Sequence, residues 1–93
     1  GLSSNFEVSN VSHRVNEITD TTVIIGEVAN NSGMNLEDAE FNISIFNKEE
    51  ELIDVLQLYF GNFPNGSKRA FKQAAPFVYP DKITFRLEFL SGM

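Results

Sequence analysis

The chain has no cysteine and no tryptophan, and it has one histidine, His13. The absence of cysteine excludes disulfide bonds, thiolate zinc sites and cysteine nucleophiles. One histidine supplies too few ligands for a dedicated zinc site, and no nucleophile motif accompanies it for a hydrolytic triad. We therefore interpret His13 as a solvent-facing strand residue, and we expect no catalytic residue, no metal site and no cofactor.

Positive charge is also scarce, because seven Lys and Arg stand against 13 Asp and Glu and give a net charge of −6. Such a surface repels phosphates, so we expect no nucleic-acid partner. No apolar run approaches the roughly 20 residues of a membrane helix, which predicts a domain that does not span a membrane. The acidic clusters at 37–40 and 49–51 lack calcium-loop spacing and are interpreted as solubilising surface.

The length of 93 residues suits one domain with one modest core, and 42% of the residues are hydrophobic. We assign residues 1–93 to a single domain. The chain begins with Gly1 instead of Met, and we interpret Gly1 as the remnant of a cleaved segment.

What the sequence has in abundance is alternation of apolar and polar residues, most strictly in AEFNISIFN (39–47) and KITFRLEFL (82–90). Alternation of this kind predicts strands with one buried face in an antiparallel sheet. We expect six or seven strands, at about 5–18, 21–30, 37–47, 51–60, 68–74 and 81–90. Short strands at this spacing predict an all-β fold, an antiparallel β-sandwich.

The same alternation predicts a buried set, which consists of Ile24, Val28, Phe41, Ile43, Ile45, Phe71, Phe85 and Leu87. Gly26 lies on the face of Ile24 and Val28, and strand residues follow it where a phosphate-binding loop would need a helix. We interpret Gly26 as a packing glycine that leaves room for a bulky side chain of the opposite sheet, or as a bulge.

Two further residues carry local predictions. Asn30 ends a predicted strand, and its side chain is expected to tie that end to the next loop. Pro64 and Gly66 predict a type I turn over residues 63–66, with Pro64 in the second position.

Aromatic residues gather in LQLYFGNFP (56–64), where both faces of the predicted strand are apolar, and in PFVY (76–79). Either loops cover these residues or they form a partner-binding patch. The candidate residues of that patch are Leu58, Tyr59, Phe60, Phe63, Phe77 and Tyr79. The uncharged half-strand LQLYF is also a candidate for edge pairing, so we expect a monomer or a weak edge-strand homodimer.

Residues 24–54, IIGEVANNSGMNLEDAEFNISIFNKEEELID, resemble the FxLYD domain family. The family's strand-end motif is similar to Gly26, Val28, Asn30 and Ser32. Its name-giving strand is similar to Ile43, Ile45, Phe46 and Asn47, and a later element to Pro64, Gly66 and Phe71. The likeness covers about residues 20–90 and departs from the family at NKEEE (47–51), which lacks the usual hairpin glycine. The resemblance implies an immunoglobulin-like sandwich of a prokaryotic envelope or secreted protein, without an established activity or a site to carry over.

Together these features favour a non-catalytic interaction or spacer module, extracellular or in the cell envelope, that contacts a protein partner or a neighbouring domain. A rival is a metal-dependent carbohydrate-binding domain or a small hydrolase, which would need a concave pocket lined by carboxylates, His13 or aromatic residues. A third alternative is a cytoplasmic subunit that pairs through its edge strands.

Overall fold

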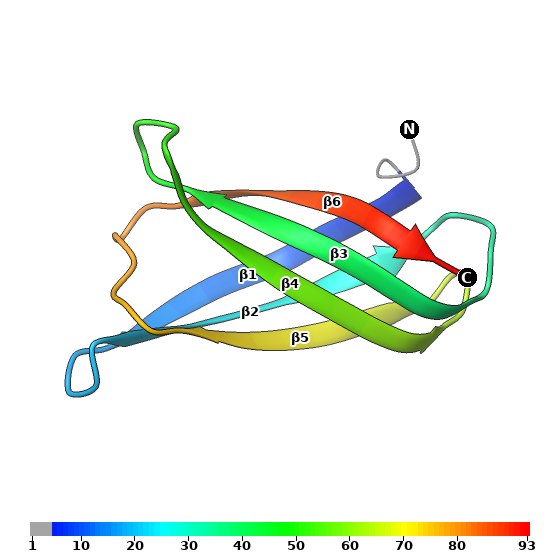
Figure 1. Ribbon diagram of the computed structural model, residues 1–93, viewed down its shortest axis with the longest axis horizontal. Coiled ribbons are helices and arrows are strands. Elements are labelled where there is room, and N and C mark those ends of the chain that lie inside the picture. The colour runs from blue at the N-terminus through cyan, green and yellow to red at the C-terminus, as the bar shows by residue number, and fades with distance from the viewer. Residues whose placement is uncertain (1–4) are drawn as a thin grey trace.

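The computed structural model describes residues 5–93, which form two antiparallel three-stranded sheets packed face to face (Figure 1). The strands are β1 (Phe6–Asn16), β2 (Thr21–Asn30), β3 (Leu36–Phe46), β4 (Leu52–Phe63), β5 (Lys68–Ala75) and β6 (Thr84–Gly92). The predicted all-β antiparallel sandwich is confirmed, with six strands in this part of the chain. Residues 5–93 contain no helix that is long and apolar enough to cross a membrane.

The sheets have the strand orders β1-β2-β5 and β4-β3-β6. In immunoglobulin-like terms these orders correspond to strands A, B, E and to strands C′, C, F. The central strands β2 and β3 have neighbours on both sides, whereas β1, β5, β4 and β6 are edge strands. The edge strands β1 and β6 contact each other on one side of the sandwich, and β4 and β5 contact each other on the other side.

An aromatic cluster around Phe41 joins the two sheets. Phe41 is fully buried on β3. Its ring centroid lies 4.9 Å from that of Phe6 on β1 and 5.5 Å from that of Phe89 on β6, both with edge-to-face geometry. Phe60 and Phe63 of β4 complete the cluster at 5.9 and 6.3 Å. Rings at these distances and angles attract one another beyond their area burial.

Most of the predicted core is buried, namely Ile24, Val28, Phe41, Ile43, Ile45 and Phe71. The prediction is wrong for Phe85, which is 37% exposed, and for Leu87, which is half-buried. Both residues lie on the inner face of β6, opposite Ile45 and Ile43 of β3. They are incompletely covered because β6 and the facing strand β1 are both edge strands.

Gly26 is a packing residue, as predicted. It pairs with Phe71 of β5, and a Cβ atom at Gly26 would lie 2.6 Å from Phe71 Cζ and 3.1 Å from Val11 Cγ2. Because real Cβ contacts are longer, a side chain here would displace the ring. The ring comes from the adjacent strand of the same sheet, whereas we expected one from the opposite sheet.

The side chain of Asn30 ties the end of β2 to two loops, which confirms and extends its prediction. Asn30 Nδ2 donates to the carbonyl oxygens of Met34 and Phe63, each at 2.9 Å. Asn30 Oδ1 accepts from Ser32 N at 3.0 Å and from Ser32 Oγ at 2.6 Å. Since Phe63 ends β4, the amide group links one sheet to the other.

The predicted turn at 63–66 is displaced by one residue. Ser67 N donates to the Pro64 carbonyl at 3.2 Å, so the turn runs from Pro64 to Ser67. Gly66 has φ 83°, which suits the third position of a type II turn, where glycine is favoured.

Replacing Asn30 with Ala should destabilise the fold by about 2–4 kcal/mol, because each buried polar group left unpaired costs about 1–3 kcal/mol. The measurement is urea unfolding. Asn31→Ala is the matched control, since Asn31 is exposed, and it should change stability by about 0.5 kcal/mol or less. Equal losses in the two variants would contradict the role assigned to Asn30.

Phe41→Ala should cost about 3–5 kcal/mol, as large buried aromatic residues do. Phe85→Ala should cost only about 1–2 kcal/mol, because a half-covered ring gains less from burial. Thermal unfolding of both variants gives the comparison. A loss for Phe85→Ala that matches the loss for Phe41→Ala would show that the side of the sandwich near β6 is closed in solution.

Candidate functional site

The chain enters and leaves the sandwich at the same end. β1 begins where β6 finishes (Figure 1), and the Phe6 ring stacks on the Phe89 ring with centroids 4.7 Å apart. The opposite end is built by the connections 17–20, 47–51 and 76–83, and we term it the loop end. In sandwich domains, binding residues frequently lie on such clustered loops.

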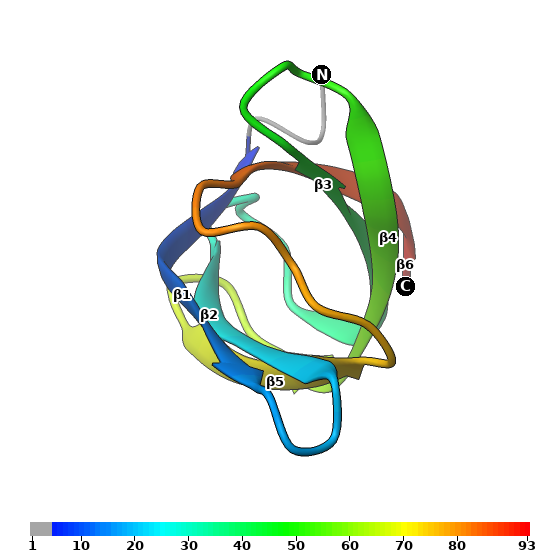
Figure 2. The same cartoon turned by 90° about the vertical axis from the view of Figure 1, so that its left-hand side faces the viewer.

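The connection 76–83 crosses the loop end from one sheet to the other (Figure 2). Tyr79 anchors it and is almost completely buried. Tyr79 N donates to Thr22 Oγ1 at 2.9 Å, and this hydroxyl donates to the Phe77 carbonyl at 2.8 Å. The Tyr79 hydroxyl donates to Asp54 on β4. The connection is therefore bound to both sheets.

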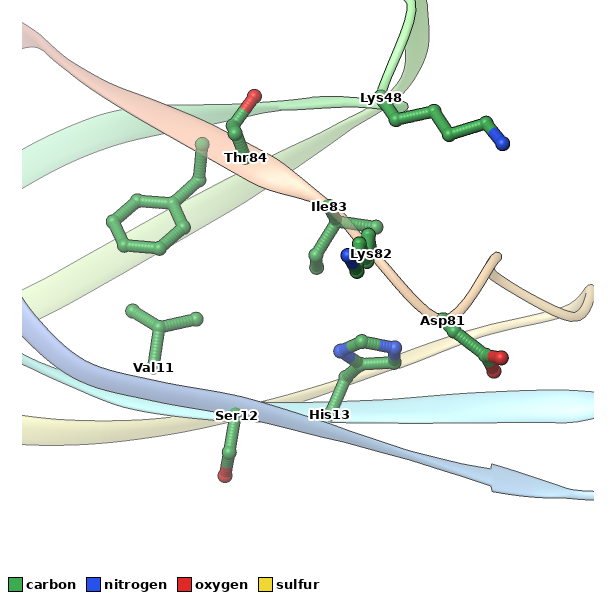
Figure 3. Close-up of a pocket in the computed structure, with 9 residues that line it drawn as sticks. Val11, Ser12, His13, Lys48, Asp81, Lys82, Ile83 and Thr84 are labelled. Carbon is green, nitrogen blue, oxygen red and sulfur yellow. The ribbon is translucent and has the colours of Figure 1, made fainter.

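A groove lies between the edge strands β1 and β6 near the loop end, with a volume of about 560 Å³ (Figure 3). We term it the β1/β6 groove. Val11 and Ile83 point into it, and Phe85 also lines it. Lys48 and Lys82 contribute positive charge to its lining, and Asp81 contributes one negative charge. The groove thus combines an apolar floor with a mainly basic rim on an acidic protein.

A bulge in β1 shapes the groove. Ser9 pairs with Glu27 and Ser12 with Ile25, so Asn10 and Val11 together stand opposite the one residue Gly26. Asn10 adopts φ 53°, and its Nδ2 donates to Glu27 Oε1 at 2.7 Å. A bulge of this kind redirects side chains, and here Val11 contacts the inner side. The sequence carried a signal for it in Gly26, although the position of the bulge on the neighbouring strand was not predicted.

The prediction that His13 faces solvent is wrong. His13 is half-buried, and its Nε2 lies 3.1 Å from the Pro80 carbonyl oxygen. A carbonyl only accepts, so Nε2 carries the hydrogen and donates. Ser12 points away from the groove while His13 points toward it, as adjacent strand residues must (Figure 3). This pair therefore does not have the geometry of a nucleophile and its base.

Metal-ligating groups do not converge in the described range, 5–93, where no three His, Cys, Asp or Glu side chains are placed to hold an ion. The apolar floor and lysine rim of the β1/β6 groove suit a different ligand. They fit a segment that carries apolar side chains and negative charge.

The opposite side of the sandwich, between β4 and β5, is closed. Arg69 of β5 donates to the carbonyl oxygens of Gly61 and Asn62 on β4, the former at 2.7 Å. Its guanidinium also lies 6.0 Å from the centroid of the Phe63 ring. Strand β4, which was the predicted edge for pairing, therefore has part of its edge engaged by Arg69.

The predicted aromatic patch does not form a continuous surface. Four of its members, Leu58, Phe60, Phe63 and Tyr79, are buried in the core. Tyr59 is 61% exposed on the outer face of β4, and Phe77 is 38% exposed at the loop end. The strand alternates normally through Phe60, and Asn62 at φ 52° then interrupts the alternation, so that Phe63 also turns inward.

The Tyr59 side chain is held along the sheet surface by its hydroxyl, which donates to Asp38 on β3. This hydrogen bond is the largest cause of a raised pKa of Tyr59.

Comparison with protein-family models, curated proteins and solved structures finds no significant match to this chain.

Burial, followed by the hydrogen bond to Asp54, raises the pKa of Tyr79 well above its usual value of 10.0. In the unfolded chain this tyrosine ionises near pH 10, whereas in the folded chain it stays protonated. Its contribution to stability is therefore complete below about pH 10 and is lost as the pH rises further.

We expect Tyr79→Phe to lose about 1–2 kcal/mol at pH 7, through the lost hydrogen bond. The free energy of unfolding of the wild type should then fall more steeply above pH 10 than that of the variant. Urea unfolding between pH 7 and pH 11 measures both effects. The two proteins differ only at residue 79, so parallel curves above pH 10 would contradict the shift assigned to Tyr79.

Proposed function

We propose that the protein is a non-catalytic interaction module of an envelope or secreted protein, and that it binds a protein partner in the β1/β6 groove. The observation that carries the proposal is the combination of a half-covered apolar floor, at Val11, Ile83 and Phe85, with Lys48 and Lys82 beside it. On a chain of net charge −6, such a site favours a partner segment that is apolar and acidic.

The position of the groove supports an interaction role more than a role as a linear spacer. It lies near the loop end, whereas both ends of the folded chain lie at the opposite end (Figure 1). The groove and its loops therefore face away from the end at which β1 begins and β6 finishes. The proposed location rests on the resemblance of residues 20–90 to FxLYD domains.

The test is selection of short linear peptides from a random phage-displayed library on the immobilised domain. We expect the enriched peptides to combine apolar and acidic residues. Their binding should weaken by about tenfold or more in the double variant Lys48→Glu, Lys82→Glu, since like charges facing across an interface cost several kcal/mol. Amide chemical-shift changes on titration should centre on Val11 and Ile83.

The matched control is the double variant Lys68→Glu, Lys72→Glu, which makes the same charge change at exposed positions of β5. It should retain peptide binding. If the peptides bind both double variants equally, or if the shift changes lie outside the groove, the proposed function is wrong.

A further inference from the structure

The connection 47–51, which joins β3 to β4, stands at one side of the loop end. In both views the connection 76–83 lies between it and the connection 17–20 (Figures 1 and 2). Three consecutive exposed glutamates form its tip, and an exposed leucine follows them, so the segment consists of Glu49, Glu50, Glu51 and Leu52. We term these four residues the acidic tip. They combine negative charge with an apolar side chain, which is the chemistry that the β1/β6 groove favours.

The main chain of the acidic tip is held in place by Asn47. Asn47 Oδ1 accepts from Glu49 N at 3.0 Å and from Glu51 N at 2.9 Å. Glu50 N donates to the Asn47 carbonyl, and Asn47 N donates to the Glu51 carbonyl, each at 3.0 Å. A segment that is already ordered in this way loses less conformational entropy when it binds.

Glu50 has a backbone conformation that its residue type rarely adopts. Its φ is 65°, in the left-handed region, where glycine is favoured. The other non-glycine residues with positive φ in the described range are of the types that tolerate it best, namely Asn10, Asp20 and Asn62. Within residues 5–93 the Glu50 side chain has no hydrogen bond or ion pair that offsets this strain. A strained residue without local support indicates a role outside the monomer.

The acidic tip is better placed to enter a groove than the second acidic cluster, residues 37–40. That cluster lies within β3, whose main chain pairs with a strand on each side. The tip, in contrast, adjoins the β1/β6 groove of its own molecule, because Lys48 precedes Glu49 and also lines the groove. Each molecule therefore presents a tip and a groove next to each other, which is the arrangement that a two-fold dimer requires.

We propose that the occupant of the β1/β6 groove is the acidic tip of a second copy of this chain, in a two-fold dimer in which each copy fills the groove of the other. The inference rests on the proposed function, since it concerns the same groove, and it identifies the partner. The Glu50 carboxylate meets Lys82 of the second copy, and Leu52 packs on the apolar floor. The three negative charges of the tip complement the mainly basic rim.

The experiment is sedimentation velocity of the 93-residue chain across concentrations up to about 1 mM, the range of a weak dimer. The wild type should form dimers. Glu50→Lys alone and Lys82→Glu alone should each weaken dimerisation by about tenfold or more, because like charges then face each other in both grooves. An equimolar mixture of the two variants should dimerise again, since their heterodimer has opposite charges in both grooves.

Glu50→Gly separates a role in binding from a role in folding. It should weaken the dimer, because the carboxylate is lost, without lowering the midpoint of urea unfolding at low protein concentration, where the chain is monomeric. Glycine adopts a positive φ without strain, so the monomer loses nothing by the change. A lower midpoint together with unchanged dimerisation would show that Glu50 acts within the monomer and would overturn the proposal.

Two matched controls make the same charge changes away from the contact. Lys72→Glu lies on β5 and Glu17→Lys in the connection 17–20, both at exposed positions, and both should leave dimerisation unchanged. Circular dichroism establishes that every variant is folded. A charge-reversal variant that fails to fold is replaced by Glu50→Gln or Lys82→Gln, which should weaken the dimer without reversing a charge.

A wild type that stays monomeric at about 1 mM overturns the second copy as the occupant, and a dimer that is insensitive to both single substitutions does the same. Failure of the proposed function is read separately. Glu50→Gly leaves the groove intact and should still bind the library-selected peptides. A chain that dimerises as described but binds no library peptide supports the inference and contradicts only the binding of a foreign partner.

Discussion

The burial of Phe41 is the interaction on which the rest of the structure depends. A chain of this size without disulfide bonds must hold its two sheets together by noncovalent contacts, and the packing around Phe41 lies at their centre. Phe41 occupies the central strand of one sheet and meets rings from β1, β4 and β6. Because one residue couples three strands and both sheets, the edges around it can be left partly open without loss of the core.

The two sides of the sandwich, where an edge strand of one sheet meets an edge strand of the other, are closed to different extents. Between β4 and β5, the Arg69 guanidinium and the Tyr79–Asp54 hydrogen bond connect the sheets through polar groups. Between β1 and β6, the connection is the stack of Phe6 on Phe89, at the end where the chain enters and leaves. Toward the loop end the β1/β6 groove opens between the two strands, and there His13 of β1 contacts the Pro80 carbonyl of the connection 76–83. The groove is thus a direct consequence of closing one side of the sandwich and only half of the other.

The sequence predicted the strands well, because alternation maps onto burial wherever a strand has neighbours on both sides, as β3 does. The same alternation gave a wrong prediction of burial for Phe85. Burial on an edge strand depends on whether another part of the protein covers that strand, and the local sequence pattern does not contain this information. The sequence left open whether Tyr79 is covered or exposed, because its burial depends on Thr22 and Asp54, which are 57 and 25 residues away in sequence. The groove escaped prediction because it arises from the bulge opposite Gly26, where the pairing of two strands decides which side chain turns inward.

The even number of strands in residues 5–93 accounts for the placement of the loops. The six described strands reverse direction from one to the next, so β6 finishes at the end where β1 begins, and the connections of the loop end face away from it. The half-exposed inner face of β6 and the adjoining β1/β6 groove lie on the side of the sandwich that is only partly closed, and there the apolar side chains of a partner can pack against Phe85 and Ile83.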